Sequence, residues 1–381
     1  MDCNGDGVNN NNMFSKIKII LFLLCFLVLP STVFANNTDA SEDIFKARVV
    51  EVLENREIEN DNGSLTIQQK LRLKGLEKKW KNQEIIFDGM EYDVIASVSY
   101  KVGDRVLVNY NKDVDGQDMF FVIGFVRHGF LYLLAFLFAV IVILVGRFKG
   151  ARALLVLIFT FLIILKFIIP NILAGNSPLM ISIVGSFFIL LISIYVTEGF
   201  NRNSTVAIFS ILISLLCTGL LSVWFTNLAK LNGFANEDVL YLIEMAGSNI
   251  NVKGLLLAGI IIGALGVLDD VVVSQVVLVG ELKKINARLP KRILYKKAMK
   301  VGISHLSSMV NTLFLAYAGA TLPLLILFSV KQEPALSFNQ IINNEIIATE
   351  IVRTLAGSVG LVLAVPLSTL LAVYFVRARN S

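Results

Sequence analysis

The chain has 381 residues, of which 55% are apolar and 17% are charged, and its mean hydropathy is +0.72. Soluble domains carry about 25% charged residues, so this composition excludes an ordinary soluble protein and indicates a polytopic membrane protein. The net charge of +5 does not indicate nucleic-acid binding, because the basic residues cluster in short segments between apolar stretches.

Residues 1–35 have the pattern of a secretory signal peptide. Lys16 and Lys18 give a basic start, residues 17–29 form an apolar core, and a V-x-A sequence ends at Ala35, where cleavage is expected. Met13 is the expected true start of the chain. An uncleaved anchor helix is the alternative, and either reading places the following segment outside the cytoplasm.

Residues 36–127 have the pattern of a small extracytoplasmic β domain. Six short runs of β type, from ARVVEVLE to MFFVIGFV, are separated by turn signals such as Asn62-Gly63 and Asp88-Gly89. This spacing predicts a small β-barrel of the OB-like type. The segment from Asn111 to Gly116 begins like a calcium loop, but Val122 stands where the bidentate Glu is expected, so neither a metal nor a cofactor is predicted.

Residues 128–381 contain seven apolar stretches long enough to cross a bilayer core of about 30 Å. The basic segments 147–152, 283–300 and 377–379 then all fall on the cytoplasmic side, as the positive-inside rule requires. The expected fold is an all-α polytopic bundle of about seven transmembrane helices, with a cytoplasmic C-terminus. The predicted spans are 129–146, 153–170, 179–197, 205–225, 254–281, 302–330 and 347–376.

Two adjacent carboxylates, Asp269 and Asp270, lie near the middle of the fifth predicted span. A charge at the bilayer centre costs at least about 2.5–3.5 kcal/mol on insertion scales, so the pair must be neutralised, paired or hydrated inside the bundle. Two close carboxylates are expected to share a proton, because like charges disfavour double ionisation. We therefore predict a role in binding a proton, a cation or a substrate. The alternative is a structural pair that fixes helix packing.

A stripe of small residues accompanies Asp270. Helical spacing places Gly259, Gly263, Gly266, Asp270 and Ser274 on one face, and glycines at such spacing let another helix approach closely. We therefore expect Asp270, more than Asp269, to point into a helix contact. Its expected neighbours come from the sixth span, at a depth near Asn311.

Further polar residues are candidates for lining a path through the membrane. Gln275, Asn311 and Thr312 are placed on the path, with helix–helix hydrogen bonding as the alternative for Asn311 and Thr312. His305 is a weaker candidate that also suits the membrane interface. Glu350 and Arg353 are weaker candidates as well, because their i,i+3 spacing suits a surface pair.

The segment GALGVLDDVVVSQ, from Gly263 to Gln275, resembles the signature region of the YibE/F-like family of bacterial membrane proteins. The layout agrees, with a signal-like start, an exported β domain that ends in the segment Gly103–Val106, and about seven spans. The resemblance implies a bacterial plasma-membrane protein and a family core at Asp269, Asp270, Ser274 and Gln275. It implies no particular activity.

We expect a secondary transporter or permease-like protein that uses the acidic pair for proton or cation coupling. The alternative is an assembly, accessory or sensor protein in which the pair is structural. No phosphate loop, nucleophile elbow or HExxH motif occurs, and adjacent aspartates point apart by about 100°, so an enzyme is not expected. The expected partners are the lipid bilayer, a small ion or molecule, and a second copy or partner membrane subunit, but no nucleic acid.

Overall fold

The computed structural model describes residues 44–59, 65–90, 99–112, 116–234, 237–246, 250–329 and 337–376. They divide into two compact units, a β domain whose unit extends to Ile141 and a helical region that begins at Val142. The predicted signal peptide, residues 1–35, and the basic tail residues Arg377 and Arg379 lie outside the described residues.

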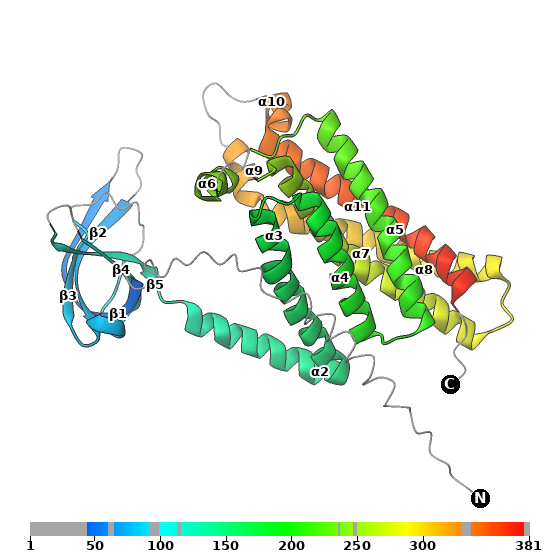
Figure 1. The fold of residues 1–381 in the computed structure, drawn as a ribbon, viewed down its shortest axis with the longest axis horizontal. Coiled ribbons are helices and arrows are strands. Elements are labelled where there is room, and N and C mark those ends of the chain that lie inside the picture. The colour runs from blue at the N-terminus through cyan, green and yellow to red at the C-terminus, as the bar shows by residue number, and fades with distance from the viewer. Residues whose placement is uncertain are drawn as a thin grey trace, which may run out of the picture. The chain divides into compact units, whose positions relative to one another are not determined.

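The β domain is an antiparallel sheet with the strand order β3-β2-β1-β4-β5 (Figure 1). Alternate residues of the strands point to one buried core, as Phe45, Ala47 and Val49 do in β1. The strands are β1 (Ile44–Glu59), β2 (Leu65–Gly75), β3 (Glu84–Asp88), β4 (Arg105–Lys112) and β5 (Asp118–Phe125), with a short 3-10 turn at Lys78–Trp80.

The described strands form an open sheet. Five of the six predicted strands are present, and the remaining run, residues 91–100, lies almost wholly outside the described residues. The edge strands β3 and β5 each pair with one described neighbour, so the predicted closure into an OB-like barrel is not confirmed.

The helical region begins with α2 (His128–Ile163), whose start belongs to the β-domain unit. A π-helical turn, Ile164–Ile168, and α3 (Ile169–Leu173) continue it directly. The other helices are α4 (Pro178–Thr197), α5 (Arg202–Leu228), α6 (Glu237–Ala246), α7 (Val252–Ile285), α8 (Lys291–Ala320), α9 (Leu322–Ser329), α10 (Phe338–Asn343) and α11 (Glu345–Phe375).

Five helices of the described chain are long and apolar enough to cross a membrane: His128–Leu173, α4, α5, α7 and α11. The first contains both the first and the second predicted span, separated by a break at Arg147 (φ 50°, ψ −130°). The sixth predicted span corresponds to the later part of α8 and to α9. Polar residues such as His305 and Asn311 lower the hydropathy of α8, so it is not among the five. The exact count of seven is therefore not confirmed.

Helix α7 is the centre of the bundle and packs against α4, α5, α8 and α11 (Figure 1). Helices α4 and α7 run parallel and in register. A Cβ atom on Gly254 would lie 3.1 Å from Pro178, and Ser193 bonds to Asp269, so both contacts join residues that are 76 positions apart. Helix α5 presents a buried hydroxyl stripe to the bundle, and its Thr218 leaves no room for a Cβ atom on Gly360 of α11.

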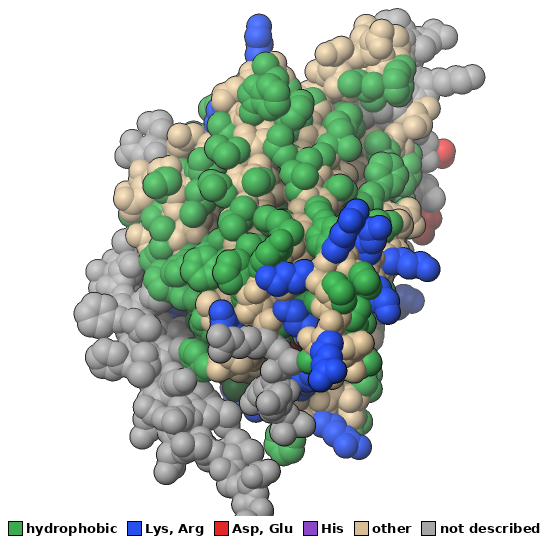
Figure 2. Space-filling model, turned by 90° about the vertical axis from the view of Figure 1, so that its right-hand side faces the viewer, with side chains coloured by type: hydrophobic (Ala, Val, Ile, Leu, Met, Phe, Trp, Pro, Cys, Tyr) green, Lys and Arg blue, Asp and Glu red, His purple; other side chains and the backbone are tan. Residues whose placement is uncertain are grey.

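The bundle has one strongly basic end, formed by the ends of α4, α7 and α11 and the starts of α5 and α8. Lys283 of α7 donates hydrogen bonds to the carbonyls of Val373 and Val376 at the end of α11. Most Lys and Arg side chains on the face shown in Figure 2 gather in its lower half, and hydrophobic side chains cover the area above them. At the opposite end, Glu345 of α11 accepts hydrogen bonds from the backbone N–H groups of Asn232 and Gly233.

Candidate functional site

Asp269 lies in the contact between α7 and α4. Its Oδ2 atom accepts a 2.7 Å hydrogen bond from Ser193 Oγ. Its Oδ1 atom is buried and has no hydrogen-bond partner among the described residues. A carboxylate oxygen that is removed from water and left without a donor is unfavourable, unless the group is protonated or binds a cation or water. One carboxylate oxygen of Asp269 is therefore buried without a compensating donor among the described residues.

The face of α4 that carries Ser193 also carries Ser182 and Ser186. They lie eleven and seven residues before Ser193, which is three and two helical turns, and both are fully buried. Their Oγ atoms have no partner among the described residues. In α5, by contrast, Ser210 and Ser214 donate to the carbonyl four residues earlier. The unsatisfied hydroxyls thus follow α4 from Asp269 toward the less basic end of the bundle.

A cavity of about 580 Å³ opens at the basic end, below Asp269. Val273, one helical turn after Asp269, and Ile194, next to Ser193, line its inner part. Glu198 and Glu281 provide carboxylates on its wall, and their basic neighbours Lys149 and Lys284 line it as well. The cavity therefore extends to Val273, about one helical turn from Asp269, and its charged groups lie farther toward the basic end.

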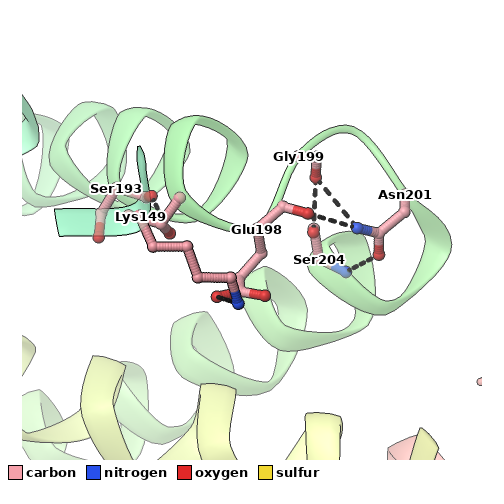
Figure 3. Close-up of polar contacts among 7 residues, drawn as sticks. Lys149, Ser193, Glu198, Gly199, Asn201 and Ser204 are labelled. Atoms are coloured by element: carbon pink, nitrogen blue, oxygen red, sulfur yellow. Dashed lines mark hydrogen bonds and ion pairs between the residues drawn. The ribbon is translucent and has the colours of Figure 1, made fainter. Parts of the chain in front are cut away.

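The turn between α4 and α5 lines this cavity, and Figure 3 shows the polar contacts within the turn. The Asn201 side chain accepts a hydrogen bond from the N–H of Ser204 and donates to the carbonyl of Glu198. Ser204 Oγ donates to the Gly199 carbonyl. Lys149 reaches the same turn, with its Nζ atom 4.0 Å from the Glu198 carboxylate. Because Asn201 caps α5, the position of Glu198 is fixed by backbone structure.

Asp270 and the glycine stripe lie on an exposed face, contrary to the prediction. A Cβ atom on Gly259 or Gly266 would meet nothing within 4 Å, and one on Gly263 would lie 3.4 Å from the Tyr317 hydroxyl. Asp270 and Ser274 are exposed on the same face. Neither Gly259 nor Gly266 therefore packs against another described helix of this chain, and their packing role stays a prediction. Larger side chains on the other faces of α7 make its helix contacts, and glycine has no side chain to bury.

The sixth-span candidates lie on the exposed side of α8, and none of them makes a hydrogen bond to α7 among the described residues. His305, Asn311 and Thr312 are all exposed, and Thr312 donates to the carbonyl of Ser308 in its own helix. Helices α7, α8 and α11 instead meet through an apolar cluster that includes Val271, Leu306, Val310, Leu313 and Leu361. An electrostatic interaction links His305 to Asp270.

Gln275 is a buried connector of three helices. Its Nε2 atom donates to the Ala298 carbonyl of α8 at 3.0 Å and to Thr369 Oγ1 of α11 at 2.7 Å. Its amide also lies within about 3 Å of the position of a Cβ atom on Gly302. These contacts position α7, α8 and α11. A role on a transport path stays a prediction for Gln275.

Glu350 and Arg353 form an i,i+3 ion pair of 2.8 Å on α11, as their spacing suggests. Both side chains are only partly exposed and line a cavity at the less basic end of the bundle. Glu350 and Arg353 therefore line a pocket of the bundle. Among the described residues, no three His, Cys, Asp or Glu side chains come close enough together to hold a metal ion.

A family described as YibE/F-like protein matches residues 134–378, which is well over half of the chain. The chain belongs to the YibE/F-like family. The comparisons with curated proteins and with solved structures gave no match. The YibE/F-like match begins inside α2 and includes Asp269, Ser193 and both cavities described above, whereas the β domain precedes it.

The polar side of α4 is absent from the sequence-based prediction. Glycine and polar spacing favour the fifth, sixth and seventh spans, so the partners of the aspartates were expected in the sixth span. The signal was present in the third span as Ser182, Ser186 and Ser193, which recur at four and seven residues in an apolar helix. In membrane helices such spacing places polar groups along one interhelical face.

Proposed function

We propose that this membrane protein is a secondary transporter or permease-like protein, in which Asp269 takes up and releases a proton or a small cation. The observation that carries the proposal is the state of the Asp269 carboxylate. One oxygen is held by Ser193, and the other is buried without a partner among the described residues, about one helical turn from an open cavity. Ionisable groups buried in this way at membrane depth mark ion and proton pathways.

The proposed topology has about seven spans in the plasma membrane of a bacterium. The segments around the basic end carry most of the positive charge of the helical region. The positive-inside rule therefore assigns them to the cytoplasm. The β domain is then extracytoplasmic and the C-terminus cytoplasmic. In this orientation the cavity beside Glu198 gives access to Asp269 from the cytoplasm.

The route from Asp269 outward follows α4. Ser186 and Ser182 lie about 10 and 16 Å from Ser193 along the helix, from a rise of 1.5 Å per residue. Buried hydroxyls without protein partners are ordinarily satisfied by water. Waters at Ser186 and Ser182 would extend a polar route along the interface of α4 and α7. The binding step requires no enzymatic chemistry and no cofactor.

The test is proton flux into liposomes that contain the purified protein and an internal pH-sensitive dye. An imposed membrane potential should drive proton entry at least about tenfold faster than in protein-free liposomes. Asp269→Asn keeps the shape of the side chain but cannot change charge, so it should reduce flux to the protein-free rate. Asp270→Asn should reduce it less, because Asp270 is exposed. Asp88→Asn in the β domain is the matched control.

Two results decide against transport. The first is wild-type protein that moves neither protons nor sodium or potassium ions under the corresponding gradients. The second is an unchanged rate for Asp269→Asn. If that variant does not fold, Ser193→Ala, which removes the hydrogen-bond donor to Asp269 Oδ2, takes its place. A protein without flux that Asp269→Asn only destabilises would support the alternative of a structural pair in an assembly or sensor protein.

A further inference from the structure

A second cavity, of about 170 Å³, lies at the end of the bundle opposite the basic end. Val252, Leu255 and Leu256 of α7 give it an apolar wall. Thr349, Glu350 and Arg353 of α11 supply its polar groups. Binding pockets typically combine apolar walls with a few convergent polar groups in this way. At this size the cavity fits only a small molecule, since pockets for drug-sized ligands measure about 300–1,000 Å³.

Two polar atoms in this cavity are buried without a hydrogen-bond partner among the described residues: Thr349 Oγ1 and Arg353 Nε. Thr226 of α5 shares this state, whereas several other threonines of the bundle do not. Thr218, Thr321 and Thr369 each donate to the carbonyl four residues earlier in the helix. The Thr349 hydroxyl makes no such bond among the described residues, although Thr349 itself lines the cavity.

The guanidinium of Arg353 makes one hydrogen bond, and its Nε–H group has no acceptor among the described residues. Its Nη1 atom donates to Glu350 Oε1 at 2.8 Å, while Nε is buried and has no partner in the described part of the chain. Arginine binds carboxylates and phosphates by presenting two N–H groups in a planar fork. With Glu350 bonded on the Nη1 side, the Nε–H of this cavity-lining residue is left without an acceptor among the described residues.

A segment before α7 also lines the cavity, and it is hydrogen-bonded to α11. Gly233 and Val239 of the segment before α7 cover the cavity, and the Glu345 carboxylate accepts hydrogen bonds from the N–H groups of Asn232 and Gly233 at 2.7 and 2.9 Å. Glu345 begins α11, about one turn before Thr349. Helix α11 therefore positions both this segment and the polar groups of the cavity.

We propose that this cavity binds a small molecule through its carboxylate group, which accepts hydrogen bonds from Arg353 Nε and Thr349 Oγ1. Because Glu350 already balances the charge of Arg353 and lines the same cavity, each added negative charge is opposed, so a singly charged carboxylate fits better than a doubly charged phosphate. The site lies at the end that the proposed topology places outside the cytoplasm. Only the naming of this ligand as a transported substrate rests on the proposed function, since binding itself does not require flux.

The experiment measures direct binding to the purified full-length protein in detergent by scintillation proximity. Radiolabelled acetate and alanine are the carboxylate probes, and inorganic phosphate is the third probe. At least one carboxylate probe should bind saturably, and phosphate should not. Thr349→Val removes the hydroxyl at nearly constant shape, and Arg353→Lys removes the Nε donor while keeping the charge. Each should weaken binding roughly tenfold, the effect of a lost hydrogen bond to a charged group.

The matched control is Thr321→Val, which removes a hydroxyl that already donates to Tyr317 in α8 and should leave binding unchanged. The proposal is overturned if neither acetate nor alanine binds, if phosphate alone binds, or if Thr349→Val leaves binding unchanged. If Arg353→Lys does not fold, the isosteric Thr349→Val decides. Binding without flux in the liposome assay would overturn the transport function and leave this site in place.

Discussion

Lys283 and Lys284 are neighbours with different surroundings at the end of α7. Lys283 Nζ donates to three carbonyls of the last turn of α11, where cations also interact favourably with the helix dipole. Lys284 pairs with Glu281 in an exposed i,i+3 bridge. Exposed pairs of this kind contribute about 0–1 kcal/mol. Lys283 should therefore matter more for stability than Lys284.

Replacing each lysine by methionine tests this difference. Lys283→Met should destabilise the bundle by about 1–2 kcal/mol, because charge-assisted hydrogen bonds to the α11 carbonyls are lost. At about 2–4 °C per kcal/mol, the melting temperature in detergent should fall by several degrees. Lys284→Met should change it by about 1–2 °C or less. Equal melting temperatures for the two variants would refute the capping role of Lys283.

Gln275 supports a second prediction at the residue scale. Gln275→Leu keeps most of the side-chain volume but removes the hydrogen bonds to Ala298 and Thr369, so the protein should lose about 1–2 kcal/mol of stability. The melting curve of the purified protein, with exposed Gln83→Leu as the control, measures the loss. Unchanged melting in Gln275→Leu would mean that the three-helix connection is not important for stability.

The two aspartates show what residue spacing reveals and what it does not. Their position in the middle of an apolar stretch is enough to predict a special site from the sequence alone. Which of them is buried depends on which faces of α7 its neighbours cover, and that is a property of the whole bundle. Ser193, 76 residues away, decides the matter by bonding to Asp269. The spacing of residues within one helix gives no information about a contact between residues that far apart in the sequence.

At the element scale, glycines on α7 and α11 have opposite surroundings. Gly360 of α11 packs directly against the side chain of Thr218 of α5, whereas Gly266 of α7 has open space at its Cβ position. The sequence analysis predicts a close helix approach at Gly266. Of the two, only Gly360 has that role among the described residues.

Alanine substitutions should separate these two glycines. Gly360→Ala should cost about 1–3 kcal/mol, because the added methyl group overlaps the Thr218 side chain in a tightly packed contact. Gly266→Ala should be neutral or should stabilise the protein by up to about 1 kcal/mol through helix propensity. Melting temperatures of the two variants in detergent provide the measurement.

Double substitution identifies the cause of any loss at Gly360. Thr218→Ala in the Gly360→Ala background should recover part of the lost stability, because the overlapping atoms are removed. Destabilisation by Gly266→Ala, equal to that of Gly360→Ala, would show instead that the glycine face of α7 is covered, as by a second copy of the chain.

Element boundaries were more predictable than element contacts. The alternating runs gave five strands close to their observed positions, because strand periodicity is a local property. The helical stretches were located for the same reason. The break at Arg147 also falls in a predicted loop, although the helix resumes immediately after it. Barrel closure and the partner of each helix depend on long-range pairing, which composition and spacing do not specify.

At the scale of the whole molecule, the ends of the bundle differ in charge. Lys283, Arg288 and Lys291 lie at the basic end, together with the segments that enter α5 and leave α11. The opposite end carries fewer cations, and Lys253 there donates to Asn227. This asymmetry underlies the proposed orientation, because basic loops are retained in the cytoplasm.

Single cysteines at the two ends test the orientation directly. Ala229, after α5, and Ala287, after α7, are exposed alanines in short connections, so each can be replaced by cysteine with little change in packing. In a background without the native cysteines, a membrane-impermeant maleimide should label Ala229→Cys in intact cells. Ala287→Cys should be labelled only after the cells are permeabilised. Lys101→Cys in the β domain should behave like Ala229→Cys.

The opposite labelling pattern at positions 229 and 287 would invert the bundle. The cavity beside Glu198 would then open to the exterior, and the cavity beside Arg353 to the cytoplasm. Labelling at position 101 only after permeabilisation, with the other two as expected, would instead move the β domain inside. That result requires an even number of crossings between the β domain and the cytoplasmic loop at position 287. It would therefore contradict the count of about seven spans as well as the exported position of the β domain.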